Sequence, residues 1–255
     1  MSNIFIPKSW NEVSLDKYKE LISIKTEEYS TPFFYKLEVL AILNETSTDD
    51  ELFEDLDIDE LSTILDDIKW IFDAPNGLKN TIKDYKLKDI KRITLGEFID
   101  LDKLFENHTE NLDLICSILF KKYKEDEWGN AIEEPYIYDL EKRRVDFIDI
   151  PINHIIGIIK YFLEFRELIF NTFSIIFTNP EDLEEPEDTE NLSQEEIEEI
   201  KKEIEIEKSK SKWSWLKLIY DVCDGDIAKT DAVTNLSLVY VLKTLAMIKE
   251  LDIKK

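Results

Sequence analysis

The residues that could carry out chemistry are few and lie far apart in the sequence. There are two histidines, His108 and His154, and nothing in the sequence places them together. A group of aspartates near the C-terminal end suggests a calcium loop. Its spacing departs from the EF-hand pattern, which also needs a glutamate at its twelfth position. Turn and helix-cap roles explain these residues better: Asp221, Asp224, Asp226 and Asp231.

The sequence contains no recognisable enzyme motif. HExxH, CxxC, GxSxG and a Walker-type loop are all absent. The five glycines are scattered, so no glycine-rich loop could hold a phosphate. Acidic pairs such as Glu133 and Glu134 are too frequent in this composition to mark a general acid and base. We therefore expect a protein that is not an enzyme and that has no catalytic residues, cofactor or metal.

Composition limits the kind of partner. The 255 residues carry a formal net charge of -25, and 43% of them are hydrophobic. Phosphate contacts need Lys and Arg, so we expect no direct binding of nucleic acid. Cys116 and Cys223 fall within apolar patterns, which favours buried thiols over a disulfide. The N-terminal sequence MSNIFIPKSW has no basic region followed by an apolar run, so we expect no secretion signal.

Residues 151–178 are a long apolar stretch around which we expect the other helices to pack. Each charge within it, such as Arg166, would cost about 2.5–3.5 kcal/mol at the centre of a bilayer, which favours a buried helix over a membrane span. Pro151 suits the first turn of this helix, and Gly157 is expected to mark the close approach of a neighbouring helix. A narrow polar edge recurs every three or four residues: Lys160, Glu164, Glu167, Asn171, Ser174 and Thr178.

Apolar residues at helical spacing predict most of the remaining chain to be helical. Ser14 is a candidate N-cap, Pro32 suits a first helical position, and Thr94 with Glu97 fits a capping box. The expected helices span 13–24, 33–43, 57–72, 93–105 and 111–120. Short paired strands are expected at 3–7 and 81–87, and a polar surface loop at 121–139.

The composition changes abruptly after residue 178, and this change defines the expected domains. We expect a helical core domain over 1–178, an acidic linker and charged helix over 179–212, and a C-terminal helical hairpin over 213–255 that packs back on the core. The charged helix carries a thin apolar stripe of Ile197, Ile200 and Ile204. The expected fold class is mainly α, a multi-helix bundle with at most a small β element and an acidic helical insertion.

The C-terminal hairpin is expected to end in one helix that starts at Asp231. Its apolar spacing predicts a single buried face. We also expect Ile227 to pack beneath the preceding turn. The residues of the predicted buried face are Val233, Leu236, Val239, Tyr240, Leu242 and Leu245.

Two segments share one pattern. VSLDKYKEL at 13–21 and ITLGEFIDL at 93–101 both run β-branched, hydroxyl, Leu, any residue, charged, aromatic, any residue, acid, Leu. One interpretation is a duplicated helical hairpin at 13–43 and 93–120. The other is that both are ordinary amphipathic helix starts, with a Ser or Thr cap and an inward-facing Leu.

Four stretches, taken in order, resemble a known group of proteins. They are IPKSWNEVSLDKYKEL, ITLGEFIDLDKLFENHTENLDLICSILF, IEEPYIYDLEKRRVDFIDIPINHIIGIIKYFLEF and WSWLKLIYDVCDGDIAKTDAVTNLSLVYVLKTLAMIK. The most telling segments are Thr94 to Asp100 and the Trp-x-Trp followed by Gly225 and Asp226. This order resembles virion-morphogenesis proteins of tailed bacteriophages, crAss-like phages included, described as tail assembly chaperones or tail and neck components. The acidic segment departs from the group.

The resemblance implies a non-enzymatic role with no active-site residues to transfer. The implied partners are other virion proteins of the tail, neck or portal region, bound through helical surfaces in the host cytoplasm during assembly or in the virion. The chain would be a transient chaperone or a permanent tail or neck component, and an oligomer is possible. From the acidic composition, an inhibitor of a host nucleic-acid-binding protein is a third hypothesis.

Aromatic residues dominate the hot spots of protein interfaces, so they are the first candidates for partner contacts. Those in polar or terminal segments are Trp128, Tyr136, Trp213 and Trp215. For Trp213 and Trp215 a core position explains the sequence equally well. The stripe of Ile197, Ile200 and Ile204 is a further candidate surface.

Overall fold

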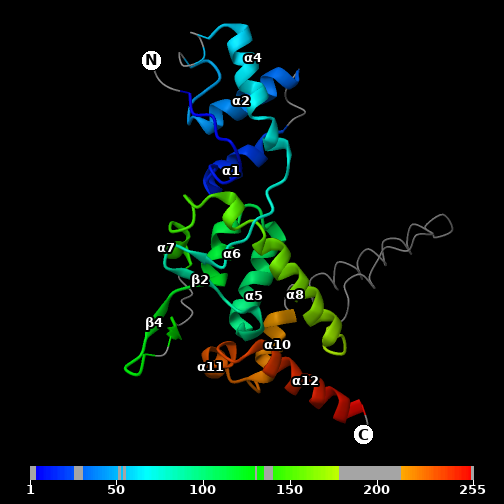
Figure 1. Ribbon diagram of the computed structural model, residues 1–255. Coiled ribbons are helices and arrows are strands. Elements are labelled where there is room, and N and C mark those ends of the chain that lie inside the picture. Colours follow the sequence, from blue (N-terminus) through cyan, green and yellow to red (C-terminus); the bar gives the residue numbers. More distant parts are fainter. Residues whose placement is uncertain are drawn as a thin grey trace, which may run out of the picture. The chain divides into compact units, whose positions relative to one another are not determined.

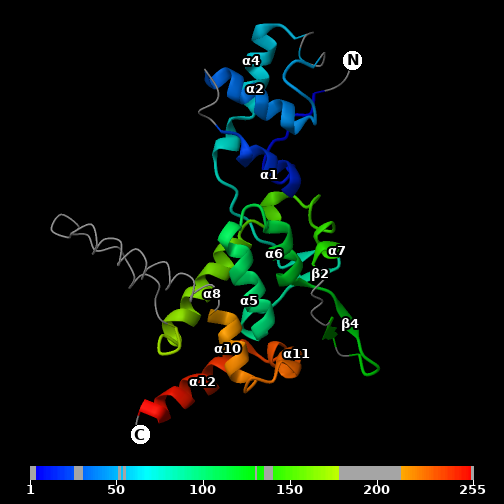
Figure 2. The same ribbon diagram turned by 180° about the vertical axis from the view of Figure 1, so that it is seen from behind.

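The computed structural model describes residues 4–25, 31–50, 53, 56–129, 131–134, 140–177 and 214–253. Within these ranges the chain is mainly helical, as the sequence predicts, and it also contains two small antiparallel sheets (Figures 1 and 2). The chain divides into two compact units. Unit 1 contains residues 1–88 and 104–162, and unit 2 contains residues 89–103 and 163–255. The acidic segment 179–212 lies outside the described residues.

The N-terminal part of unit 1 is helical, and its helices start where the sequence predicts. Ser14 accepts a hydrogen bond from the backbone N of Lys17 at 3.3 Å, and Pro32 begins the second helix. Asp57 and Glu60 form a capping box at the next start, which satisfies backbone N–H groups that have no partner within the helix. The elements are α1 (Leu15–Ser23), α2 (Pro32–Leu43), α4 (Ile58–Asp67) and the 3-10 helix η2 (Lys69–Phe72).

The first sheet differs from the prediction. Residues 81–87 form a hairpin and not one strand, because Lys83 adopts φ +52° and the chain reverses there. Residues 4–7 are not its partner strand, since the backbone N of Phe5 bonds to the Asn44 side chain at 2.7 Å. The strands are β1 (Thr81–Ile82), β2 (Tyr85–Leu87) and β3 (Phe120–Lys121), in the order β1-β2-β3.

Helix α6 (Leu112–Leu119) is the most deeply buried helix of unit 1. Its Asp113 is 1% exposed, and its carboxyl group has two cationic partners. Lys19 Nζ of α1 and Arg144 Nη2 of α7 (Glu141–Arg144) both lie 2.9 Å from its carboxylate oxygens. The Asp113 side chain therefore joins three helices. The apolar residues of α6 are fully buried around it: Leu112, Ile115, Cys116, Ile118 and Leu119.

The apolar stretch 151–178 is not one continuous helix. A short 3-10 helix, η5 (Ile152–His154), precedes α8 (Ile158–Thr172), so Pro151 does not start the long helix. Gly157 marks a close approach to the segment at Gly77, not to a helix. Its backbone N bonds to Gly77 O at 2.9 Å, and a Cβ here would lie 2.9 Å from Leu78 Cβ.

The buried face of α8 is also narrower than expected. Leu163 and Leu168 are 43% and 58% exposed, whereas one stripe is buried: Ile158, Phe162, Phe165, Ile169 and, just beyond the helix, Phe173. The helix is therefore amphipathic rather than apolar around most of its circumference. Among the described residues, no helix is both long and apolar enough to cross a membrane.

Unit 2 contains the C-terminal helices, and the predicted final helix proves to be two. The first of these two helices ends at Thr234, because Ser237 forms a β-bridge with Thr94. The expected burial of Ile227, Leu236 and Tyr240 is wrong, since they are 78%, 40% and 62% exposed. The elements are η3 (Ile90–Arg92), α5 (Leu95–Leu104), α10 (Ser214–Val222), η7 (Ile227–Lys229), α11 (Thr230–Thr234) and α12 (Leu238–Ile253).

The two segments with a shared sequence pattern also share a hydrogen-bond geometry. In unit 1, Leu15 N donates to Ile150 O at 2.9 Å, and Ile152 N donates to Val13 O at 2.8 Å. In unit 2, the matching bonds run from Leu95 N to Leu236 O at 2.9 Å and from Leu238 N to Ile93 O at 3.1 Å. Each helix start thus pairs with a segment that leads toward a long helix. The two segments are therefore similar in backbone hydrogen bonding as well as in sequence. Their origin by duplication of a helical hairpin remains a prediction.

Candidate interaction site

A β-hairpin occupies the stretch that was expected to be a surface loop. Its strands are β4 (Tyr123–Glu125) and β5 (Ala131–Glu133), paired antiparallel with Lys124 opposite Ile132. The turn is held by Asp126, whose side chain accepts from Trp128 N at 2.9 Å and whose carbonyl accepts from Gly129 N at 3.0 Å. Gly129 adopts φ +78°, a conformation that glycine permits at low cost.

Trp128 projects from the tip of this hairpin. It is 82% exposed, and Ile132 on β5 is 54% exposed. A large aromatic side chain gains most when a partner covers it, so such exposure is typical of a contact residue. Three acids stand directly before it in the sequence: Glu125, Asp126 and Glu127. The tip therefore presents an apolar ring beside negative charge.

The base of the hairpin is fixed to unit 1 by ion pairs. Lys88, only 4% exposed, contacts the Glu133 carboxylate, and Tyr123 Oη donates to Glu133 Oε2 at 3.4 Å. Lys124 pairs with Glu134 at 2.9 Å on the surface. Lys88 N also donates to Leu119 O at 2.8 Å, which connects the base to the end of α6. These contacts anchor the strands of the hairpin to unit 1.

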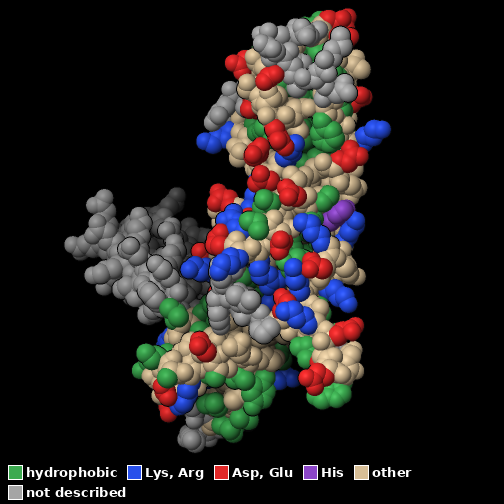
Figure 3. All heavy atoms as spheres, turned by 90° about the vertical axis from the view of Figure 1, so that its left-hand side faces the viewer, with side chains coloured by type: hydrophobic (Ala, Val, Ile, Leu, Met, Phe, Trp, Pro, Cys, Tyr) green, Lys and Arg blue, Asp and Glu red, His purple; other side chains and the backbone are tan. Residues whose placement is uncertain are grey.

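Basic side chains gather on the face that carries α7 and β4 (Figure 3). Lys122 Nζ and the Arg143 guanidinium lie 4.6 and 5.4 Å from the ring centre of Tyr85. A hydrogen bond with Asp84 raises the pKa of Lys122 and lowers that of Asp84. Burial, followed by a hydrogen bond to Asp146, raises the pKa of Tyr85. Lys122 and Asp84 are therefore both held in their charged forms, and Tyr85 is held neutral.

The other predicted contact residues occupy different environments. Trp215 lies within unit 2, where its Nε1 donates to Asp102 Oδ2 at 2.9 Å and its ring lies 5.5 Å from that of Phe98 and 5.4 Å from that of Phe177. Asp102 also pairs with Arg166 at 2.5 Å. These contacts favour the core interpretation of Trp215. The other candidates lie outside the described residues: Tyr136, Trp213, Ile197, Ile200 and Ile204.

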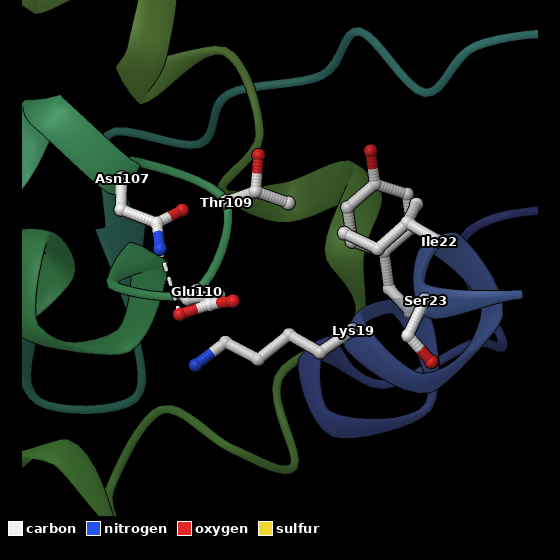
Figure 4. Close-up of a pocket in the computed structure, with 7 residues that line it drawn as sticks. Lys19, Ile22, Ser23, Asn107, Thr109 and Glu110 are labelled. Carbon is white, nitrogen blue, oxygen red and sulfur yellow. Dashed lines mark hydrogen bonds between the residues drawn. The ribbon is translucent and has the colours of Figure 1, made fainter.

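A surface hollow of about 410 Å³ lies in unit 1 between α1 and the segment before α6 (Figure 4). Several of its polar side chains have partners within the protein. The Ser23 hydroxyl donates to Glu20 O at 2.7 Å, Asn107 donates to Glu110 at 2.7 Å, and Lys19 pairs with Asp113. A nucleophile would need a base beside it, and the Ser23 hydroxyl has a carbonyl instead.

The histidines and the C-terminal aspartates lie in environments that differ from one another. His108 stacks on Phe105 with ring centres 6.0 Å apart. Burial, followed by the nearby charge of Lys79, lowers the pKa of His154 and favours its neutral form. Asp226 caps a turn by accepting from Ala228 N at 3.1 Å. Among the described residues, no cluster of three or more His, Cys, Asp or Glu side chains could hold a metal ion.

Comparison with known proteins adds no relative. A scan against protein-family models, a search of the curated proteins and a search of the solved structures each found no match. The choice of the hairpin tip as the candidate interaction site therefore depends on geometry and sequence pattern alone. Sequence reasoning selected Trp128 but missed its setting on a hairpin, for which the alternation in Tyr123 to Glu125 and the Trp-Gly turn were the available signals.

Proposed function

We propose that this protein is a non-enzymatic bacteriophage virion-assembly factor that binds other tail or neck proteins. The proposal rests on the sequence resemblance and on one structural observation, the 82% exposed Trp128 at the tip of an anchored hairpin. A stem that is anchored at its base and presents an aromatic ring is suited to insertion into an apolar pocket of another protein. The acids before Trp128 favour a pocket with a basic rim.

The test uses infected cells of the host of the phage that encodes the chain. A tagged copy is captured during assembly, and co-purified proteins are compared by mass spectrometry with those of purified particles. We expect virion proteins to be captured by the wild-type chain. Trp128→Ala should lose them at least tenfold, because truncating an interface hot spot costs about 2 kcal/mol or more.

The matched control is Phe72→Ala, which removes another exposed aromatic ring, 56% exposed, from η2. This variant should capture the same virion proteins as the wild type. Equal capture by the Trp128 variant would contradict the role of the hairpin. Capture of a basic host nucleic-acid-binding protein in place of virion proteins would support the inhibitor hypothesis and overturn the assembly role.

The content of purified particles distinguishes a permanent virion component from a transient chaperone. A permanent tail or neck component is present in purified virions at a fixed ratio to other tail proteins. A transient chaperone is present in infected cells and absent from virions. Quantitative mass spectrometry of both samples distinguishes them.

A further inference from the structure

Helix α12 uses only one side for packing within unit 2. Leu238, Val241 and Leu242 are at most 3% exposed. Further along the same side, Lys249 Nζ donates to the carbonyls of Ile175 and Ile176 at 3.2 and 3.4 Å. In Figures 1 and 2 the C-terminal turns of α12 extend beyond α10 and α11. The opposite side of the helix therefore has no packing partner among the described residues.

That outer side carries an apolar seam. Tyr240, Met247 and Leu251 are 62%, 54% and 55% exposed, and Thr244 lies between them. The Thr244 hydroxyl donates to Tyr240 O at 3.0 Å within the helix. Its methyl group is the apolar part that remains for a contact. The spacing of four, three and four residues is the a/d spacing of a two-stranded coiled coil. A strict seam of this kind fits another helix better than a flat surface.

The charges beside the seam have a definite order. Lys243 and Glu250 lie seven residues apart and flank the seam on the same edge, one positive and one negative. Both are exposed, and neither has an ion-pair partner among the residues that the structure describes. In a two-stranded pair these are the positions that select partner and direction.

We propose that the outer face of α12 binds the same face of a second copy of this chain, with the two helices antiparallel. Two-fold symmetry places Tyr240 against Leu251 of the second copy and Thr244 against its Met247. The same register brings Lys243 next to Glu250 of the second copy, twice. A parallel pair would instead place Lys243 beside Ile248 of the second copy and leave both charges unpaired. The charge pattern thus selects an antiparallel homodimer.

The seam is short, so the dimer is weak. From Tyr240 to Leu251 the helix spans about 16 Å at 1.5 Å per residue. Interfaces of this size fall in the weak, transient class. This inference is independent of the proposed role in virion assembly, because it concerns only copies of the purified chain.

The test is sedimentation equilibrium of the full chain from about 10 to about 500 μM, a range suited to weak interfaces. We expect the wild type to dimerise within it. Lys243→Glu and Glu250→Lys each replace two attractions by two repulsions and should weaken the dimer about tenfold. The double variant K243E/E250K reverses both signs and should restore wild-type association.

Two controls separate this surface from general effects of charge and folding. Lys8→Glu makes the same change in net charge on an exposed residue of unit 1 and should leave association unchanged. Met247→Asp should abolish the dimer while the circular dichroism spectrum keeps its helical signal. A chain that stays monomeric throughout the range would overturn the proposal. So would a dimer that is insensitive to Met247→Asp, or a double variant that fails to recover.

Discussion

Removing the buried carboxylate of Asp113 should destabilise unit 1 more than any surface charge change. The side chain is 1% exposed, whereas its partners Lys19 and Arg144 keep 20% and 39% of their side-chain surface. Breaking a buried ion pair by removing one partner costs about 3–5 kcal/mol. Because both cations can turn toward water, we expect Asp113→Ala to fall near the lower limit, at about 3 kcal/mol.

Asp113→Asn separates charge from shape. The amide keeps an oxygen acceptor for Arg144 but loses the ionic part of each bond. Charge-assisted bonds are about twice as strong as neutral ones, so this variant should lose about half as much stability as Asp113→Ala. The control is Glu134→Gln, which breaks the exposed pair with Lys124 and should cost at most about 1 kcal/mol.

Hydrogen exchange measured by mass spectrometry suits this question because the chain has two units and one unfolding curve would mix them. A loss of about 3 kcal/mol should speed exchange about 100-fold in peptides from α1, α6 and α7. Peptides from α11 and α12 serve as the internal reference. Exchange in α6 that changes less than about fivefold in Asp113→Ala would refute the reasoning that this carboxylate joins the helices.

Four further predictions follow from the packing within each unit. Burial raises the pKa of Cys116, so its thiol should resist alkylation in the folded protein and react once urea unfolds it. For the same reason the contribution of Cys116 to stability should be constant below about pH 8.5, the ordinary cysteine pKa, and should fall above it as the unfolded thiol ionises, which unfolding at several pH values checks. Gly157→Ala should cost about 1–3 kcal/mol in urea unfolding, because the new Cβ meets Leu78 Cβ at 2.9 Å. Trp215→Ala should cost about 3 kcal/mol and speed hydrogen exchange in α10, whereas Trp215→Phe keeps most ring contacts and should cost less.

Signals that act within a few residues could be predicted from sequence. The caps at Ser14 and at Thr94 with Glu97 are present because donor and acceptor lie within four positions of each other. The hairpin over 81–87 was missed because its reversal uses Lys83 with positive φ, where glycine or asparagine is the usual signal. A local pattern can specify a turn only when the turn uses the residues that favour it.

Burial was harder to predict than helicity. The expected buried face of the last helix included both buried and exposed residues: Leu242 is fully buried, whereas Tyr240 is 62% exposed. Periodicity identifies an apolar face but not which of two apolar faces packs inward. Trp128 shows the same limit for the candidate site, because composition marked it as a contact residue but only the hairpin explains its 82% exposure.

The paired backbone bonds at the two similar helix starts have a consequence for synthesis on the ribosome. The hydrogen-bond partner of Leu15, Ile150, is synthesised 135 positions later. The partner of Leu95, Leu236, is synthesised 141 positions later. At about 5–20 residues per second, each nascent helix stays without its distant partner segment for about 7 to 28 s. During that interval the first turn of each helix has its local backbone bonds and its side-chain cap, Ser14 in one case and Thr94 with Glu97 in the other. Loss of either cap should therefore reduce the yield of soluble chain in cells more than it reduces the stability of the finished protein.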